Sequence, residues 1–564
     1  MEALDWLVIG VFFLALIGII VWVVRQKQND SADYFLGGRE ATWLAIGASI
    51  FASNIGSEHL IGLAGAGASS GMAMAHWEIQ GWMILILGWV FVPFYSRSMV
   101  YTMPEFLERR YNPQSRTILS VISLVSYVLT KVAVTVYAGG LVFQQVFGIK
   151  ELWGIDFFWI AAIGLVVLTA LYTIFGGMKS VLYTSVLQTP ILLLGSLIIL
   201  VLGFKELGGW DEMMRVCGAV TVNDYGDTMT NLIRSNDDAN FPWLGALIGS
   251  AIIGFWYWCT DQFIVQRVLS GKNEMEARRG TIFGAYLKLL PVFLFLIPGM
   301  IAFALHQKYI GAGGEGFLPM LANGTANADA AFPTLVAKLL PAGVKGLVVC
   351  GILAALMSSL ASLFNSSAML FTIDFYKRFR PETPEKKLVG IGQVATVVIV
   401  ILGILWIPIM RSVGDVLYTY LQDVQSVLAP GIAAAFLLGI CWKRTSAQGG
   451  MWGLIAGMVI GLTRLGAKVY YSNAGEVADS TFKYLFYDMN WLFFCGWMFL
   501  FCIIVVIVVS LATKAPTAEK IQGLVFGTAT KEQKAATRAS WNHWDIIHTV
   551  IILAITGAFY WYFW

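Results

Sequence analysis

Five charged side chains interrupt otherwise apolar stretches of the sequence. They are Glu58, Glu78, Lys131, Asp261 and Lys288. A charge at the centre of a bilayer costs at least about 2.5 to 3.5 kcal/mol on insertion scales, so each of these residues requires a reason. They pair with one another, lie near an interface, or form a polar binding site. Because they occur beside interrupted helices, the binding site is the favoured interpretation.

A subset of polar residues has the donors and acceptors that suit a neutral polyhydroxylated solute. These residues are Asn54, His59, Glu78, Lys288 and Gln422. Sugars require several directional hydrogen bonds and usually an aromatic face. Tyr257 and Trp258 could supply that face or close over it as a gate. Most of the rings in a chain with 14% aromatic residues nevertheless belong to the core or to the interfacial belts.

Small and hydroxyl-bearing residues recur at helical spacing between residues 355 and 367. They are Ala355, Ser358, Ser359, Ser362, Asn365, Ser366 and Ser367. Small residues let helices approach closely in lipid, which explains most of the stripe. Adjacent hydroxyls that face the carbonyls freed by a broken helix also form an all-oxygen pocket without a fixed carboxylate. Such a pocket suits a desolvated monovalent cation better than a divalent one.

The composition excludes several classes of protein. Of the 564 residues, 58% are hydrophobic and 13% are charged, whereas about a quarter of the residues in a soluble domain are charged. A formal net charge of +3 provides no basic surface for nucleic acid. The sequence shows no nucleophile with its base, no phosphate-binding loop and no His/Cys metal spacing, so we expect no enzyme. A polytopic protein of the lipid bilayer is expected.

Apolar runs bounded by charged and turn-forming residues predict about fourteen membrane spans, since one span needs roughly 20 apolar residues. Their approximate centres are residues 15, 55, 88, 132, 165, 192, 255, 293, 357, 399, 428, 460, 500 and 553. Short cytoplasmic loops carry the excess of Lys and Arg. If the N-terminus is outside, about two thirds of the 37 Lys and Arg residues fall in inside loops. Both termini of this multi-pass protein are therefore predicted to face outward from the cell membrane.

The second and seventh spans are interrupted by polar and glycine residues, at residues 53–59 and 256–262. Five spans separate the two interruptions, as expected for two five-helix halves of inverted topology that each open with a broken helix. We expect a single transporter domain over residues 1–564. Its inverted-repeat core covers about residues 40–440, with peripheral helices at about 1–25 and 448–564.

Several motifs, taken in order along the chain, carry a family resemblance. They are DYFLGGR at 33–39, ASNIGS at 52–57, YWCTDQ at 257–262, IVQR at 264–267, SSLAS at 358–362, DFYK at 374–377 and WKR at 442–444. From about residue 30 to 470 the sequence resembles the sodium/solute symporter family, specifically its sodium/glucose cotransporter branch. The resemblance implies an all-α membrane protein of fourteen helices with the inverted-repeat fold, which imports a sugar together with sodium.

The resemblance also implies residue roles by matching position. The implied sodium ligands are the backbone carbonyls of Ala52, Ile55 and Ala355 and the hydroxyls of Ser358 and Ser359. The implied sugar contacts are Asn54, His59, Glu78, Lys288 and Gln422, with Trp77 flanking, Tyr257 as the inner gate and Trp258 beside it.

Two departures from the family pattern bear on stoichiometry and selectivity. Ser185 stands where sugar-transporting members commonly have an aspartate, and Ala361 lies on the ninth span, so a second sodium site is not expected. Gly254 stands where members have an Asn, Thr or Ser that contacts the sugar. The resemblance therefore leaves open which sugar is preferred.

Other couplings and functions remain open at the level of sequence. Glu58, His59 and Glu78 can titrate, which makes the proton a rival coupling ion. A pocket of serines and carbonyls contains no group that must lose a proton to bind its ion, which favours sodium. We expect one sodium per glucose- or galactose-type hexose. The alternatives are another polyhydroxylated solute such as myo-inositol, or a sugar sensor or channel of the same fold.

Overall fold

The computed structural model describes residues 1–564 except 27, 29, 57, 322–323, 413–416 and 474–477. The described chain is helical apart from a short antiparallel pair of strands, β1 (Glu151–Leu152) and β2 (Ile155–Asp156). The longer helices are α1 (Ala3–Val24), α3 (Trp43–Asn54), α9 (Pro113–Ser126), α10 (Ala133–Phe147), α11 (Phe157–Leu207), α13 (Trp243–Gly254), α15 (Glu274–Lys288), α16 (Ile297–Gly311), α18 (Val344–Met369), α20 (Glu385–Ser412), α21 (Leu417–Cys441), α22 (Ala447–Asn473), α24 (Trp491–Ala512) and α26 (His543–Tyr562).

Shorter helices cap, extend or connect the long ones. They are α2 (Ser31–Leu36), α4 (Ala64–Ser70), α5 (Ala75–Glu78), α6 (Gly81–Ile86), α7 (Val92–Ser98), α8 (Met103–Arg110), α12 (Trp210–Gly218), α14 (Gln262–Leu269), α17 (Ala331–Leu339), α19 (Lys377–Phe379), α23 (Thr481–Lys483) and α25 (Lys531–Ala539). Several π-helical turns continue these helices, among them η2 (Glu58–Leu63), η5 (Tyr127–Val132), η6 (Phe255–Thr260) and η7 (Val292–Leu296).

The described residues contain 11 helical segments that are long and apolar enough to cross a membrane. This finding confirms a polytopic, all-α membrane protein, while the count of fourteen spans stays a prediction. The segments differ in how far the protein itself buries them. The most apolar window of the segment containing α18 is 89% buried, against 22% for α1 and for α26. The segment that contains α18 is therefore central, and α1 and α26 present most of their surface to lipid.

Both interruptions expected from the sequence are present as broken helices. Helix α3 ends at Asn54, Ile55 is extended with ψ 103°, and the π-turn η2 resumes the span. In the seventh span, α13 and η6 end at an extended Asp261 with ψ 128°, and α14 continues. Because π-turns are rare and often occur at functional sites, the π-turns beside both breaks indicate that this region is a candidate functional site.

A third discontinuity separates the predicted spans centred on residues 165 and 192. These two runs form one segment, α11, which bends at Gly177 with φ 52° and ψ −148°. A side chain is strained at such a φ. A Cβ on Gly177 would also overlap the Tyr34 carbonyl oxygen and lie 2.9 Å from Tyr34 Cδ2. Glycine thus permits both the bend and the close approach of α2.

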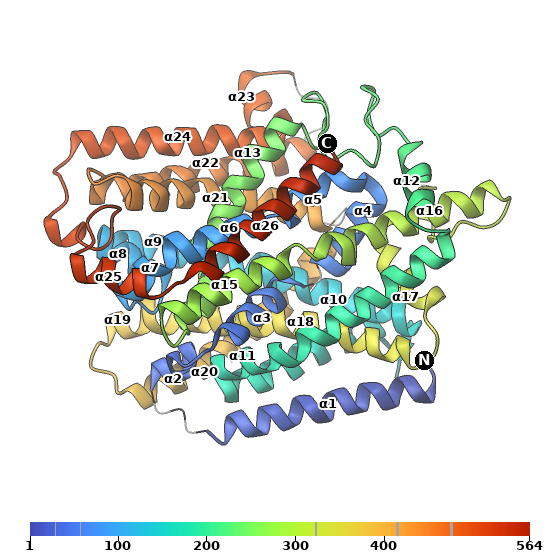
Figure 1. Ribbon diagram of the computed structural model, residues 1–564, viewed down its shortest axis with the longest axis horizontal. Coiled ribbons are helices and arrows are strands. Elements are labelled where there is room, and N and C mark those ends of the chain that lie inside the picture. The colour runs from blue at the N-terminus through green and yellow to red at the C-terminus, as the bar shows by residue number, and fades with distance from the viewer. Residues whose placement is uncertain (27, 29, 57, 322–323, 413–416, 474–477) are drawn as a thin grey trace.

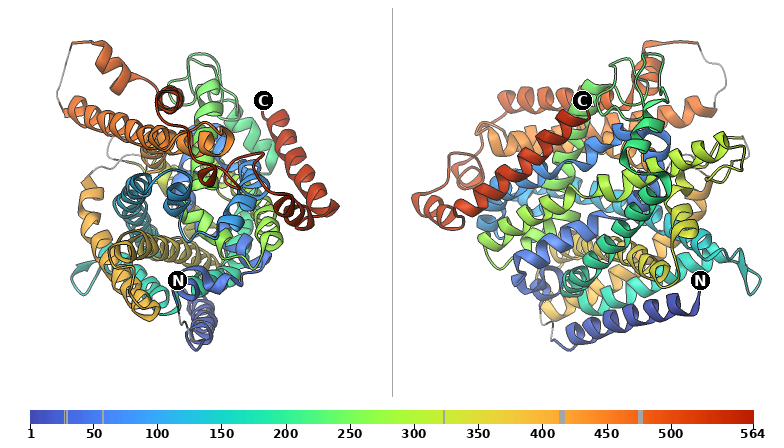
Figure 2. Two further views of the ribbon diagram at one scale, coloured as in Figure 1. Left: turned by 90° about the vertical axis from the view of Figure 1, so that its left-hand side faces the viewer. Right: turned by 45° about the vertical axis from the view of Figure 1, so that its right-hand side comes forward.

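The helices are arranged around α18 (Figures 1 and 2). Helices α11, α20, α3 and α10 pack against α18, and α1 lies along one edge of the molecule against α11 and α18. Helices α22 and α24 lie at the opposite edge and pack against α21. Ile55 and Asp261, which lie at the breaks of the two broken spans, are at most 3% exposed. Their freed backbone groups lie away from lipid, as the membrane requires.

Candidate functional site

The polar candidates meet in one cavity between the broken spans. It is lined by Asn54, His59, Trp77, Glu78, Tyr257, Trp258, Lys288 and Gln422, which are all eight residues expected to bind the solute. The cavity offers about 50 Å³ to the centres of water molecules. One water requires roughly 10 to 15 Å³ by this measure, so the cavity holds a few waters. A larger solute requires its walls to move apart.

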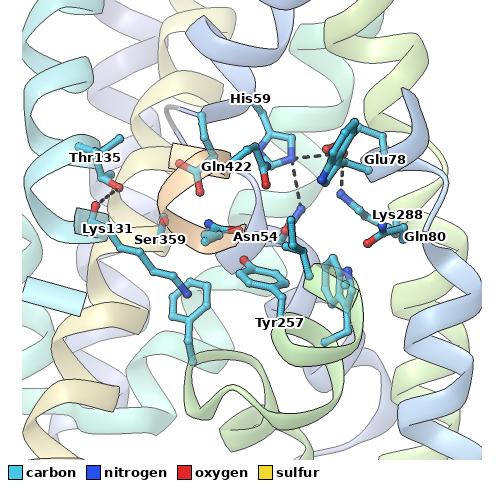
Figure 3. A pocket seen from close by; sticks show the side chains of 18 of the residues that line it. Asn54, His59, Glu78, Gln80, Lys131, Thr135, Tyr257, Lys288, Ser359 and Gln422 are labelled. Atoms are coloured by element: carbon cyan, nitrogen blue, oxygen red, sulfur yellow. Dashed lines mark hydrogen bonds and ion pairs between the residues drawn. The ribbon is translucent and has the colours of Figure 1, made fainter. Parts of the chain in front are cut away.

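One end of the cavity holds a buried charge network (Figure 3). Lys288 Nζ donates to Glu78 Oε2 at 2.6 Å, and His59 Nε2 lies 3.2 Å from the same oxygen. Asn54 Nδ2 lies 3.3 Å from His59 Nε2. All four residues are at most 4% exposed. The pairing makes burial of the carboxylate tolerable, and it presents a carboxylate, an ammonium and an amide side by side.

The opposite end contains a second buried ion pair. Lys131 Nζ donates to Asp261 Oδ2 at 2.7 Å, and the Tyr127 hydroxyl donates to the other oxygen of Asp261. The Lys131 ammonium lies 4.7 to 5.4 Å from the ring centroids of Tyr127, Trp256, Tyr257 and Phe263. Such contacts stabilise a desolvated cation. Lys131 with Asp261 and Lys288 with Glu78 thus form two buried ion pairs that flank the cavity.

The aromatic residues form two separate contacts. Tyr257 and Trp258 pack edge to face with centroids 4.9 Å apart, and the Lys288 ammonium lies 5.3 Å from the Trp258 ring centroid. Trp77 instead stacks on Trp491 of α24 at 5.5 Å. Tyr257 and Trp258 therefore form an aromatic wall beside the charge network. Trp77 joins the cavity to a peripheral helix.

Three residues that line the cavity each have a polar atom that is buried without a hydrogen-bond partner among the described residues. These atoms are Gln422 Oε1, His59 Nδ1 and Trp77 Nε1. A buried polar atom without a partner costs about 1 to 3 kcal/mol. All three residues line the cavity, so a bound solute or water can satisfy these atoms. This observation indicates a binding site more directly than the volume of the cavity does.

The sodium candidates lie where α18 meets the break after α3. Ala52 and Ile55 are buried at the break, and the chain leaves helical geometry there, which frees carbonyl oxygens of the last helical turn. Ala355, Ser358 and Ser359 are buried on the facing helix α18. Ser53 Oγ and Ser362 Oγ lie 2.6 Å apart and join the two helices directly.

The two adjacent serines point in different directions. Ser359 lines the cavity, and its Oγ lies 3.1 Å from the point where a Cβ on Gly56 would be. Ser358 Oγ lies 3.3 Å from Ser185 Oγ on α11. Glu58 Oε2 lies 2.5 Å from the same point beside Gly56. The structure therefore places a carboxylate next to the pocket that was expected to contain only neutral oxygens.

Sequence reasoning missed several residues of the cavity wall. Gln80, Thr135, Phe263 and Gln425 line it, and Glu58 and Lys131 had been identified only as buried charges. Gln80 and Gln425 each lie within three residues of a predicted contact, Glu78 or Gln422. That proximity was the available signal, but the path of the chain between α5 and α6 decides that Gln80 faces inward.

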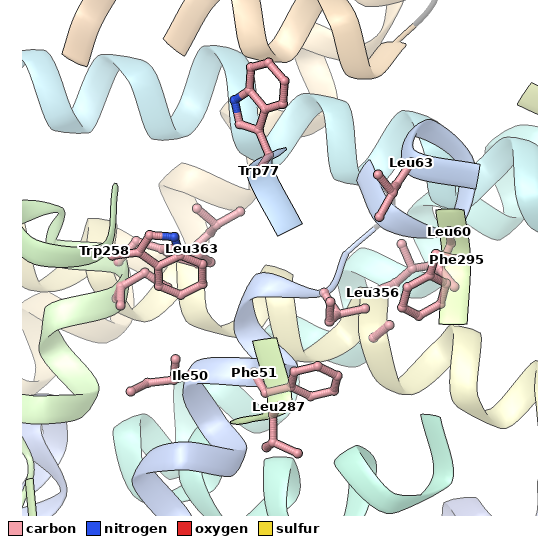
Figure 4. Close-up of a cluster of buried hydrophobic side chains, with 14 of the residues drawn as sticks. Ile50, Phe51, Leu60, Leu63, Trp77, Trp258, Leu287, Phe295, Leu356 and Leu363 are labelled. Atoms are coloured by element: carbon pink, nitrogen blue, oxygen red, sulfur yellow. The ribbon is translucent and has the colours of Figure 1, made fainter. Parts of the chain in front are cut away.

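Apolar side chains surround the break and exclude water from it (Figure 4). Ile50 and Phe51 precede the break, Leu60 and Leu63 follow it, and Leu356 of α18 packs nearby. These side chains belong to one continuous core. The polar cavity is thus surrounded by an apolar interior, where electrostatic interactions are stronger than in water.

Comparison with known proteins assigns this arrangement to a family. The model of the sodium:solute symporter family matches residues 34–457. This chain belongs to the sodium:solute symporter family. Membership confirms the resemblance derived from the sequence motifs. The protein is a sodium-coupled solute symporter of the membrane, and it is not an enzyme.

Curated members of the sodium:solute symporter family are similar over most of the chain. The mouse sodium/myo-inositol cotransporter 2 is 36% identical over 542 residues, which cover 94% of this chain and 80% of the relative. The zebrafish sodium/glucose cotransporter 4 is 36% identical over 537 residues, which cover 92% of this chain and 80% of that relative. Among solved structures, a sodium-coupled sialic acid symporter in a substrate-bound, outward-open state has a TM-score of 0.72 at 22% identity. It covers 92% of this chain and 99% of that one. This likeness supports the fold.

Proposed function

We propose that this symporter imports a neutral cyclic polyol, a glucose- or galactose-type hexose, together with sodium by alternating access. The observation that carries the proposal is the convergence of all eight expected solute contacts on one small cavity. That cavity contains unpartnered polar atoms on His59 and Gln422 beside an aromatic wall. Relatives named sodium/myo-inositol and sodium/glucose cotransporters support a cyclic polyol.

The chemistry of the cavity wall fits such a solute. Glu78 provides acceptor oxygens, Lys288 and Asn54 provide donors, and the amide of Gln422 provides both. A hydroxyl both donates and accepts, so several adjacent hydroxyls can satisfy this mixed set. Trp258 or Tyr257 can cover the apolar face of a ring. The Glu78 carboxylate is already paired with the Lys288 ammonium, so the cavity does not require a charged solute.

We propose that sodium binds between Ala52, Ile55, Ala355, Ser358 and Ser359. An ion held there links the break after α3 to α18, and the same break carries Asn54 and the turn with His59. Binding of the ion thereby orients two of the proposed solute contacts. Coupling requires that both ligands favour the same conformation, and this link satisfies that requirement.

One sodium per solute is our proposed stoichiometry. Ser185 provides no carboxylate at the contact between α11 and α18. One charge that crosses 100 mV contributes about 2.3 kcal/mol, and a tenfold sodium ratio adds about 1.4 kcal/mol. Together they sustain a solute ratio of several hundredfold, on the order of what uptake requires.

The same reasoning extends to the whole chain. We propose fourteen spans with both termini outside, and a single domain over residues 1–564. Its two inverted five-helix halves lie within about residues 40–440, with peripheral helices at about 1–25 and 448–564. The breaks after Asn54 and at Asp261 support this arrangement because each opens one half.

The test is uptake by purified protein in proteoliposomes. Labelled hexoses, myo-inositol, sialic acid and an amino acid are each presented with and without an inward sodium gradient. We expect accumulation of a hexose that requires the gradient. Preferred accumulation of myo-inositol would select the second candidate, which the names of the relatives favour. A saturable current or binding without accumulation would instead indicate a sensor or channel of the same fold.

A further inference from the structure

Gln80 occupies a space that the absence of a side chain at Gly254 creates. A Cβ on Gly254 would overlap Gln80 Oε1 and lie 2.9 Å from Gln80 Cδ. Real Cβ atoms essentially never approach other heavy atoms closer than 3.0 Å. Gln80 belongs to the turn between α5 and α6, and Gly254 ends α13, so the two residues come from different spans. The Gln80 amide can therefore occupy its position only because residue 254 is a glycine.

The amide of Gln80 is also held in a defined orientation. Its Nε2 donates to the carbonyl oxygen of Ser250 on α13 at 2.8 Å. Only the nitrogen of the amide can donate to a carbonyl, so this bond determines which end is the acceptor. Gln80 is 3% exposed and lines the cavity with Glu78 and Lys288 (Figure 3). Its Oε1 is consequently an acceptor that is fixed in place before a solute arrives.

We propose that Gln80 is a selectivity-determining contact of this transporter and that Gly254 is required to seat it. Gln80 Oε1 accepts a hydrogen bond from one hydroxyl of the polyol in the cavity. The inference rests on the proposed function, since it assigns a hydroxyl of that solute to a particular residue. An oriented acceptor favours a hydroxyl over a hydrogen, and it disfavours a carboxylate at the same place on the solute.

A hydrogen-bond acceptor in a closed site discriminates strongly, because an analogue without the hydroxyl leaves it unpaired. Among singly deoxygenated analogues of the transported polyol, one should therefore bind about tenfold more weakly than the parent. Gln80→Met keeps a side chain of similar length and removes the acceptor. We expect this variant to bind the parent and that one analogue equally, while its discrimination against the other analogues is retained.

The shared space is tested by a second pair of substitutions. Gly254→Thr in the wild-type background displaces the Gln80 amide, so binding of the polyol should weaken by about tenfold or more. In the Gln80→Ala background that space is free, so Gly254→Thr should weaken binding of the polyol by less than threefold. This non-additivity is the signature of two residues that compete for one volume.

Matched controls separate this effect from general damage. Gln393 also donates its Nε2 to a backbone carbonyl, that of Ile174 at 3.1 Å, and it lies outside the cavity. At Gly164, no atom of the described residues lies within 4 Å of the position that a Cβ would occupy. Gln393→Met and Gly164→Thr should leave selectivity unchanged. Sodium-dependent thermal stabilisation of each variant shows that it is folded.

The measurement is solute affinity and sodium-driven uptake for the wild type and all variants, with the parent polyol and its deoxy analogues. The assignment is supported if Gln80→Met no longer distinguishes the parent polyol from one deoxy analogue, and if Gly254→Thr weakens binding less in the Gln80→Ala background than in the wild type. Unchanged discrimination in Gln80→Met, or equal costs of Gly254→Thr in both backgrounds, overturns it while leaving the proposed function intact. A wild-type protein that accumulates no polyol overturns both.

Discussion

Glu78 is a buried carboxylate that is shared by two basic groups. Lys288 lies 2.6 Å and His59 3.2 Å from the same oxygen, and all three side chains are at most 4% exposed. Removal of one member of a buried pair leaves an uncompensated charge, which costs about 3 to 5 kcal/mol. Removal of both charges avoids that cost. The pair therefore offers a way to separate folding from transport.

We predict that Lys288→Gln destabilises the protein by about 3 to 5 kcal/mol and abolishes uptake. The double variant Glu78→Gln/Lys288→Gln should recover most of that stability, because no unpaired charge remains, and should stay inactive. Thermal unfolding in detergent and uptake in proteoliposomes provide the two readouts. Normal uptake by the double variant would remove both residues from the proposed site.

Ser359 offers a test of the proposed sodium pocket. Ser359→Ala removes one uncharged oxygen ligand, so the sodium affinity should fall about tenfold or more while solute selectivity is retained. Ser367→Ala is the matched control, since this hydroxyl lies on the same helix and is buried with no hydrogen-bond partner among the described residues. Sodium activation of uptake is the measurement. Equal sodium affinities in the two variants would contradict the pocket.

The sequence predicts the content of the site better than its geometry. All eight expected solute contacts line the cavity, and for the five polar ones the reason is that a polar residue in an apolar span has few other places to lie. The pairing of Lys131 with Asp261 depends on packing between segments far apart in the chain. The sequence does not encode that packing locally. The same holds for Gln80, whose direction depends on a turn and on a glycine in another span.

At the scale of elements, discontinuities in helices position the site. The breaks at Ile55 and Asp261 were expected from polar and glycine residues within apolar runs. The bend at Gly177 was not identified from the sequence, although the two flanking spans were predicted. A single glycine in an apolar run gives a weak signal, because glycine also occurs within straight membrane helices. The close contact with Tyr34 explains why glycine is needed at this position.

Gly177→Ala should therefore destabilise the protein by at least about 1 to 2 kcal/mol, because alanine is strained at φ 52° and its Cβ meets Tyr34. Gly164→Ala lies in the same segment with nothing near its Cβ position. It should be neutral or stabilising by up to about 1 kcal/mol. Thermal unfolding of the two purified variants is the comparison. A smaller loss at Gly177 than at Gly164 would disprove the role of the bend.

The proposed stoichiometry of one sodium per solute rests on the contact between α11 and α18. Ser185 and Ser358 meet there with hydroxyl oxygens 3.3 Å apart. Ser185→Asp introduces a carboxylate beside hydroxyl oxygens, a set that can bind a second monovalent cation. We predict that the charge moved per solute rises from about one toward two, which simultaneous current and uptake would measure. Ser196→Asp, a change at a buried serine farther along α11, is the control. An unchanged ratio would contradict this prediction.

At the scale of the whole molecule, a small polar cavity lies between two broken spans within one apolar core. Its small volume means that a solute of the size of the proposed hexose would enter only if the surrounding helices moved. Such motion is what the proposed alternating access requires, and the ion pairs at either end of the cavity join segments that are far apart in the chain. The all-α class and membrane location follow from composition and periodicity. The arrangement of the helices does not, because helix packing in lipid depends on small residues and complementary shape.

The central claim is that sodium at the break after α3 builds the solute site. Linkage then requires that each ligand increases the affinity of the protein for the other by the same factor. The most direct test is hexose affinity of the purified wild-type protein, measured in sodium and in choline at equal ionic strength, with sodium affinity measured in reverse. We predict an increase of about tenfold or more in both directions. Equal hexose affinity in sodium and in choline would contradict the account.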